Sequence, residues 1–135
     1  MSESLILSIF TPEKQLFDQL KIEKLSLLSV QGQMEILVNH VPLVGLLDTG
    51  IFSYQVFSKE LEYGFISTGI FEISNNHVKI LAKTLELAEE INLQRAILAQ
   101  KKALEALEKT SLSTATLKKY ELKLKRALLR QQLVK

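Results

Sequence analysis

Few residues in this chain of 135 have side chains suited to catalysis or metal binding. Cysteine is absent, which excludes thiolate nucleophiles and thiolate metal ligands, and His40 and His77 are the only histidines. Two histidines cannot build a three-histidine metal site, and no GxSxG, GxxxxGK[ST] or GxGxxG motif accompanies them. The sequence therefore predicts no catalytic centre and no metal site. We interpret His40, which lies in an apolar turn, as a hydrogen-bonded structural residue.

Basic side chains near the end of the chain are better candidates for binding. After Ser111 the only acidic residue is Glu121, whereas the basic residues include Lys118, Lys119, Lys123, Lys125, Arg126 and Arg130. A basic segment of this kind fits an acidic partner surface, which can belong to a protein, a nucleotide or a nucleic acid. The alternative is a solvated helix face that only keeps the protein in solution.

The elements that must position these residues differ between the two parts of the chain. Over residues 1–84, short segments alternate between apolar and polar residues, with turn residues between them, as in half-buried strands. Asn75-Asn76 fits a two-residue hairpin turn, and a change of phase predicts a bulge or bend near Lys24. The connections are too short for crossover helices, so a parallel sheet is not expected. We therefore predict an antiparallel β-sandwich or barrel. The expected strands are 5–10, 15–17, 20–27, 34–37, 51–57, 61–65, 71–74 and 78–80.

The pattern changes after Thr84, and residues 85–135 are predicted to form a second domain. Residues 85–109 contain no Gly or Pro and are rich in strong helix formers. The segment 110–114 then breaks the helix and offers Ser113 as the N-cap of a second one. We expect an antiparallel two-helix hairpin, so that the fold class is α+β. A stripe of small residues suits close packing of the two helices and consists of Ala96, Ala99, Ala103 and Ala106.

Composition sets the class of protein. Apolar residues make up 47% and charged residues 24%, as in ordinary globular domains. No apolar run approaches the ~20 residues that a membrane-spanning helix needs. The first residues, MSES, lack the basic start of a signal peptide, so a cytoplasmic protein is expected.

The stretch 32–50, GQMEILVNHVPLVGLLDTG, carries a resemblance to a known family. The spacing of Gly32, the strand 34–37, His40 and Val41-Pro42-Leu43 is similar to that in the epsilon subunit of bacterial F-type ATP synthases, the counterpart of the mitochondrial delta subunit. Val38-Asn39 departs from the Pro-Gly that many members have there. The resemblance continues through other segments and covers nearly all of the chain. These segments are Thr11-Pro12-Glu13, 67–73, Leu81-Ala82 and Arg95-Ala96.

The resemblance implies a non-catalytic central-stalk subunit that couples ion flow to ATP synthesis. Its β domain would join the gamma subunit to the c-ring, at the cytoplasmic face of the bacterial plasma membrane. Membrane contact would be made only through the complex. The hairpin would reach the alpha and beta subunits through the basic helix and regulate ATP hydrolysis. The coupling ion, proton or sodium, stays open. The residues expected at the junction with gamma and the c-ring are Gln33, Met34, His40, Val41, Pro42 and Leu43.

Some bacterial members of this family bind ATP through a motif of the form Ile/Leu-Asp-x-x-Arg-Ala, and a similar segment is present at 91–96. The candidate residues are Glu86, Asn92, Arg95 and Lys102. Asn92 replaces the acidic residue, and Lys102 stands where a second arginine would be expected. Lysine lacks the planar fork of arginine for phosphate, so only weak ATP binding is predicted. Alternatively, Arg95 only pairs with Glu89 or Glu90 along the helix.

Two functions of other classes remain open at this stage. One is a nucleic-acid-binding protein that uses the basic helix, although Tyr120 is the only aromatic residue after Phe71 and gives no stacking platform. The other is a small β-sandwich enzyme, which requires a pocket with convergent polar groups.

Overall fold

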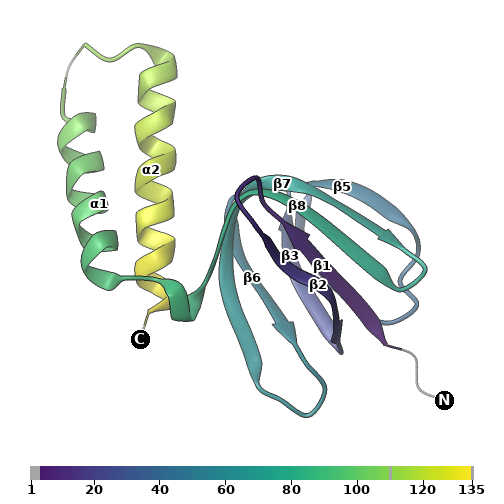
Figure 1. Ribbon diagram of the computed structural model, residues 1–135. Helices are drawn as coiled ribbons and strands as arrows, with labels where there is room; N and C mark the ends of the chain where they lie inside the picture. Colours follow the sequence, from purple (N-terminus) through teal and green to yellow (C-terminus); the bar gives the residue numbers. More distant parts are fainter. Residues whose placement is uncertain (1–3, 110, 135) are drawn as a thin grey trace. The chain divides into compact units, whose positions relative to one another are not determined.

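The computed structural model describes residues 4–109 and 111–134 of the chain, which separates into two units after Leu87. The first unit consists of β-strands and the second of helices, as the sequence predicts (Figure 1). Thr110, with which the predicted break between the helices begins, lies outside the described residues. No helix of the described residues is both long enough and apolar enough to cross a membrane.

The first unit is an eight-stranded sheet folded into a sandwich, with the strand order β2-β1-β8-β7-β5-β3-β4 and with β6 paired to β3 and β7. The sheet bends into two layers at β7, because β7 pairs with β6 through its first half and with β5 through its second half. Thr68, which lies between these halves, has a φ of 47°. The strands are β1 (Leu5–Phe10), β2 (Gln15–Ile22), β3 (Lys24–Ser29), β4 (Gly32–Ile36), β5 (Leu43–Leu47), β6 (Gly50–Gln55), β7 (Leu61–Ser74) and β8 (His77–Leu87).

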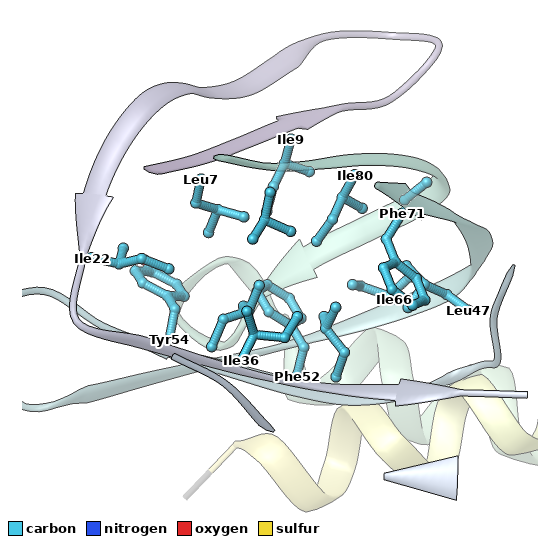
Figure 2. Packing of buried hydrophobic residues seen from close by; sticks show 14 of the residues in the cluster. Leu7, Ile9, Ile22, Ile36, Leu47, Phe52, Tyr54, Ile66, Phe71 and Ile80 are labelled. Atoms are coloured by element: carbon cyan, nitrogen blue, oxygen red, sulfur yellow. The ribbon is translucent and has the colours of Figure 1, made fainter. Parts of the chain in front are cut away.

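Alternate residues of these strands fill the space between the two layers. In β1 the side chains of Leu5, Leu7 and Ile9 are fully buried, and in the paired strand β8 those of Val78 and Ile80 lie beside them in the same layer. Figure 2 shows residues from both layers meeting in this core, in which every side chain drawn is apolar apart from the tyrosine hydroxyl. Burial of such side chains stabilises the fold by about 1.5–3 kcal/mol each. The core lies entirely within the β unit.

The sheet departs from one sequence-based expectation and confirms another. First, β1 pairs with β8 in parallel, which needs no crossover helix because the whole meander from β2 to β7 connects them. Second, of the bulge or bend predicted near Lys24, the structure has the bend, at Glu23. At Glu23 the chain leaves β2, which pairs with β1, and enters β3, which pairs with β6. Two register shifts lie earlier in β2, where Asp18 and Gln19 oppose Ser8 and where Leu16 has no opposing residue in β1.

The helical unit begins later than the sequence predicts. Leu85 is buried in the sandwich and pairs with Ile66, so residues up to Leu87 belong to β8 in spite of their helix propensity. A 3₁₀ turn (Ala88–Glu90) follows, and then helices α1 (Leu93–Leu107) and α2 (Thr114–Leu133). The predicted N-cap of α2 is confirmed, because Ser113 Oγ accepts a hydrogen bond from Thr116 N at 3.2 Å.

The two helices pack through small residues. Ala96 and Ala103 of α1 and Ala127 of α2 are buried, in agreement with the predicted alanine stripe. Near the end of α2, Gln131 Nε2 donates a hydrogen bond to Gln100 Oε1 at 2.6 Å. This bond joins the last turns of α2 to the first half of α1, so the two helices are antiparallel.

Candidate functional site

The predicted junction residues occupy a loop and the two strands beside it. Asn39 turns the chain with a φ of 69°, a conformation that asparagine tolerates better than most residues. His40 Nδ1 then donates a hydrogen bond to the Val41 carbonyl oxygen at 2.7 Å, which fits the structural role interpreted from the sequence. Val41 and Pro42 follow in an exposed segment without regular structure, and the Val41 side chain is 70% exposed.

Three of the six predicted junction residues meet in one groove. Gln33 and Met34 of β4 line it together with Leu43 of β5, whereas His40, Val41 and Pro42 do not. Gln33 is also held by its amide nitrogen, which donates a hydrogen bond to Ser26 Oγ at 2.7 Å. The groove has a volume of about 470 Å³, and the Phe71 ring forms part of its lining.

Sequence reasoning missed other exposed apolar residues on the same unit. Val44 of β5 is 70% exposed, and Val30 in the turn before β4 is exposed as well. A row of exposed apolar side chains also crosses the outer face of the sheet, because Leu46 pairs with Ile70 and Ile70 with Leu81. The apolar run 43–47 was the available signal, but it does not indicate whether the strand is covered. We call Val30, Val41, Leu43, Val44, Leu46, Ile70 and Leu81 the apolar surface of the β unit.

The four nucleotide candidates do not come from one unit. Glu86 lies on β8 and pairs with Phe65, whereas the other three belong to the helical unit. Asn92 is the N-cap of α1, since its Oδ1 accepts a hydrogen bond from Arg95 N at 3.0 Å. The alternative pairing of Arg95 with Glu89 or Glu90 along the helix stays a prediction.

A cationic groove runs between the two helices and has a volume of about 650 Å³. Of the predicted nucleotide candidates it contains only Lys102, and of the predicted basic helix only Lys123, Arg126 and Arg130. Lys109 adds a further positive charge, and Glu105 is the acidic residue of the lining. A concentration of positive charge in a concave site favours anionic ligands. The small residues Ala99, Ala103 and Ala106 also line the groove.

The surroundings of one groove cation lower its pKa. Partial burial lowers the pKa of the Arg126 guanidinium, and the positive charge of Arg130 lowers that pKa further. The ammonium groups of Lys119 and Lys123 lie 5.7 and 5.3 Å from the centroid of the Tyr120 ring, within the range of cation–π attraction. The remaining basic residues of α2, Lys118, Lys119 and Lys125, are exposed and lie outside the groove lining.

Serine and histidine also meet in the β unit, but in a structural setting. Ser8 Oγ and His77 Nε2 are 2.9 Å apart, a distance suited to a nucleophile and its base. Ser8 is only 2% exposed, however, and its oxygen accepts a hydrogen bond from Gln19 N at 3.0 Å, at the bulge of β2. This arrangement secures the bulge and leaves substrate no access to Ser8. Within residues 4–109 and 111–134, no cluster of three or more His, Asp or Glu side chains could hold a metal ion.

Residues 4–88 match the family described as ATP synthase, Delta/Epsilon chain, beta-sandwich domain. The chain belongs to this family. It is 39% identical to the ATP synthase epsilon chain of Clostridium kluyveri over the full length of both chains. It is also 39% identical to that of Lawsonia intracellularis over 76% of each chain. The resemblance seen in the sequence is thereby confirmed.

The fold agrees with this assignment. A chain of the mitochondrial ATP synthase of Euglena gracilis, in a structure of its OSCP, F1 and c-ring, superimposes with a TM-score of 0.78 at 20% identity. The match covers 90% of this chain and 75% of that one. As a member of the family, the protein is a non-catalytic subunit of ATP synthase. Neither the family nor these relatives supports the nucleic-acid alternative.

Proposed function

We propose that this subunit works in the central stalk, where its β unit joins the gamma subunit to the c-ring. The observation that carries the proposal is the apolar surface of the β unit, on which Val41 and Val44 are each 70% exposed. On it Leu46, Ile70 and Leu81 are exposed cross-strand neighbours, and such an apolar patch on a folded protein is typical of a site for another protein. The predicted junction residues Val41 and Leu43 belong to this surface, and Gln33 and Met34 line the groove beside Leu43.

The likeness to proteins of known assembly supports the choice of partners. The matching Euglena chain is part of an assembly that contains F1 and a c-ring. We therefore place this subunit at the cytoplasmic face of the bacterial plasma membrane, in contact with the membrane only through the complex. Coupling of ion flow to ATP synthesis then depends on the contacts of the β unit and requires no catalysis by this chain.

Reconstitution tests this proposal. The test enzyme is ATP synthase prepared from cells of the same organism that lack this chain, and binding of the purified chain is measured by sedimentation. We expect Leu46→Glu to weaken binding at least tenfold, because a charge would be buried against an apolar partner. Phe57→Glu is the matched control, since Phe57 is 75% exposed in the connection between β6 and β7 and lies outside the apolar surface. Equal binding of Leu46→Glu and the unchanged chain would refute this docking surface.

A second function, weak nucleotide binding, is favoured by the cationic groove of the helical unit. Lys102, Lys123, Arg126 and Arg130 line one cavity, as a polyphosphate ligand requires. Asn92 contributes to this function only indirectly, because its side-chain oxygen caps α1. Calorimetric titration with ATP tests the assignment.

We further propose that α2 restrains ATP hydrolysis by meeting acidic segments of the alpha and beta subunits. Lys118, Lys119 and Lys125 project outside the groove and are exposed, so they are available for such contacts. Each exposed ion pair would contribute only about 0.2–1 kcal/mol. Several together can bias a hairpin between two positions that differ by a few kcal/mol.

A further inference from the structure

One edge of β5 has no strand partner along most of its length. On one side β5 pairs with β7 from Leu43 to Leu47, but on the other side it meets β3 only where Leu47 lies opposite Ser29. The chain then turns at Val30 and Gln31 and returns as β4 along the opposite edge of β3. Residues 43–46 therefore extend past the end of β3 beside an empty strand position.

The alternation of the backbone identifies the groups at this edge. Val30 N donates a hydrogen bond to the Leu46 carbonyl oxygen at 3.0 Å, and Asp48 N donates to that of Leu28 at 3.0 Å. Leu46 and Asp48 thus direct their backbone groups away from β7. Because every second residue of a strand points the same way, the N–H and C=O of Val44 also point to the empty position. Among the described residues neither group has a hydrogen-bond partner.

Within residues 43–46 this edge lacks the features that protect the other edge strands, although Pro42 directly precedes it. Natural edges are blunted by charges, bulges or proline. In β2 the bulge at Gln19 and the charges of Asp18 and Lys21 serve this purpose, and β4 carries Glu35. Residues 43–46 carry no charge, and the groove of about 470 Å³ lies beside them.

The chemistry of the groove defines what fits into it. No charged side chain is among its lining residues, which include Val30, Met34, Leu43, Val44 and Leu46. The ring of Phe71 packs directly against Gly45, where a Cβ would come within 2.6 Å of Phe71 Cζ. An uncharged, extended segment would match both the backbone edge and this apolar lining.

We propose that an extended, uncharged segment of a neighbouring ATP synthase subunit adds to β5 as a further strand. It occupies the position in line with β3 and exchanges hydrogen bonds with the N–H and C=O of Val44. This inference rests on the proposed function, in which the same surface meets another subunit. It adds that backbone pairing, and not side-chain packing alone, forms the contact.

Two substitutions at one position separate these possibilities. Val44→Pro removes the N–H that faces the empty position, and an outward-facing donor of an edge strand can be lost without breaking the bonds to β7. Val44→Ala keeps that N–H and shortens the side chain. Binding of the full chain to ATP synthase depleted of this subunit is measured for both, after thermal unfolding shows that each variant melts cooperatively like the unchanged chain.

We expect Val44→Pro to weaken binding tenfold or more and Val44→Ala to weaken it less than threefold. Equal binding by Val44→Pro and the unchanged chain would overturn strand addition and leave the proposed function intact. Equal losses in the two variants would assign the contact to side-chain packing and overturn it as well. A dimer of the free chain that Val44→Pro abolishes would assign the edge to a second copy, again against the proposal. Failure of the unchanged chain to bind would instead refute the proposed function, and the strand with it.

Discussion

Asn39 and Asn76 are joined by a pair of hydrogen bonds between segments that are distant in sequence. Asn76 Oδ1 accepts a bond from Asn39 N at 2.6 Å, and Asn76 Nδ2 donates to Asn39 Oδ1 at 3.3 Å. The carbonyl oxygen of Asn76 also accepts a bond from Ile6 N at 2.8 Å. This asparagine pair therefore ties the junction loop to the β7–β8 turn, and that turn to the start of β1.

Replacement of Asn76 should loosen this tie. Asn76 has a φ of 60°, which glycine adopts freely and alanine does not. We expect Asn76→Gly to lower the free energy of unfolding by about 1–2 kcal/mol through lost hydrogen bonds. Asn76→Ala should cost about 1–2 kcal/mol more through backbone strain. Urea unfolding measures both, and an alanine variant as stable as the unchanged chain would contradict the role of this turn.

Substitution of Thr49 should stabilise the β unit, in contrast to substitution of Asn76. It is 1% exposed, and its Oγ1 has no hydrogen-bond partner among the described residues. A buried hydroxyl without a partner costs about 1–3 kcal/mol, so Thr49→Val should stabilise the β unit by roughly 1 kcal/mol. Thr49→Ser is the control, because it keeps the hydroxyl and loses a buried methyl group. Thermal unfolding gives the order of stability, and a destabilised valine variant would mean that the hydroxyl is satisfied.

ATP should bind the isolated chain only weakly. The side-chain oxygen of Asn92 accepts a bond from Arg95 N, and Lys102 presents a single ammonium group to the cationic groove. We expect a dissociation constant no tighter than roughly millimolar, which corresponds to about 4 kcal/mol. Calorimetry at low salt measures it. Lys102→Arg should tighten binding and Arg126→Gln should weaken it, whereas micromolar binding by the unchanged chain would contradict the prediction.

Loss of the basic helix should release ATP hydrolysis. A chain that ends at Thr110 lacks α2, and we expect the enzyme reconstituted with it to hydrolyse ATP faster while still synthesising it. A second variant, Lys118→Glu with Lys119→Glu, keeps the helix and reverses two exposed charges. The difference in ATP hydrolysis between this charge-reversal variant and the unchanged chain should shrink as salt rises, because exposed charges are screened beyond about 8–10 Å. Identical hydrolysis by all three enzymes at low salt would show that α2 has no restraining role.

Local signals in the sequence predicted those features that depend on a few neighbouring residues. The Asn75-Asn76 turn is confirmed by φ values of 50° and 60°, and Ser113 caps α2 as expected. The predicted start of α1 at residue 85 was wrong, because burial of Leu85 in the sandwich outweighs the helix propensity of residues 85–87. Tertiary packing commonly overrides propensity in this way.

The candidate surfaces were predictable only in part. The family pattern pointed to Gln33, Met34 and Leu43, which share a groove, but the exposure of Val44 depends on where β3 ends. An apolar run reads the same whether its strand is covered or open. Likewise, the cationic groove combines Lys102 with Arg126, and only the packing of α1 against α2 decides which lysines join them.

The long strand β7 has a mechanical consequence. Its first half is hydrogen-bonded to β6 and its second half to β5, with Thr68 between them and no break in the strand. A force applied at the β5 side therefore reaches the β6 side along one covalent backbone. Its transmission does not depend on side-chain contacts between the layers. Shearing one layer past the other would require the backbone at Thr68 to deform, so the sandwich transmits load as a stiff coupling.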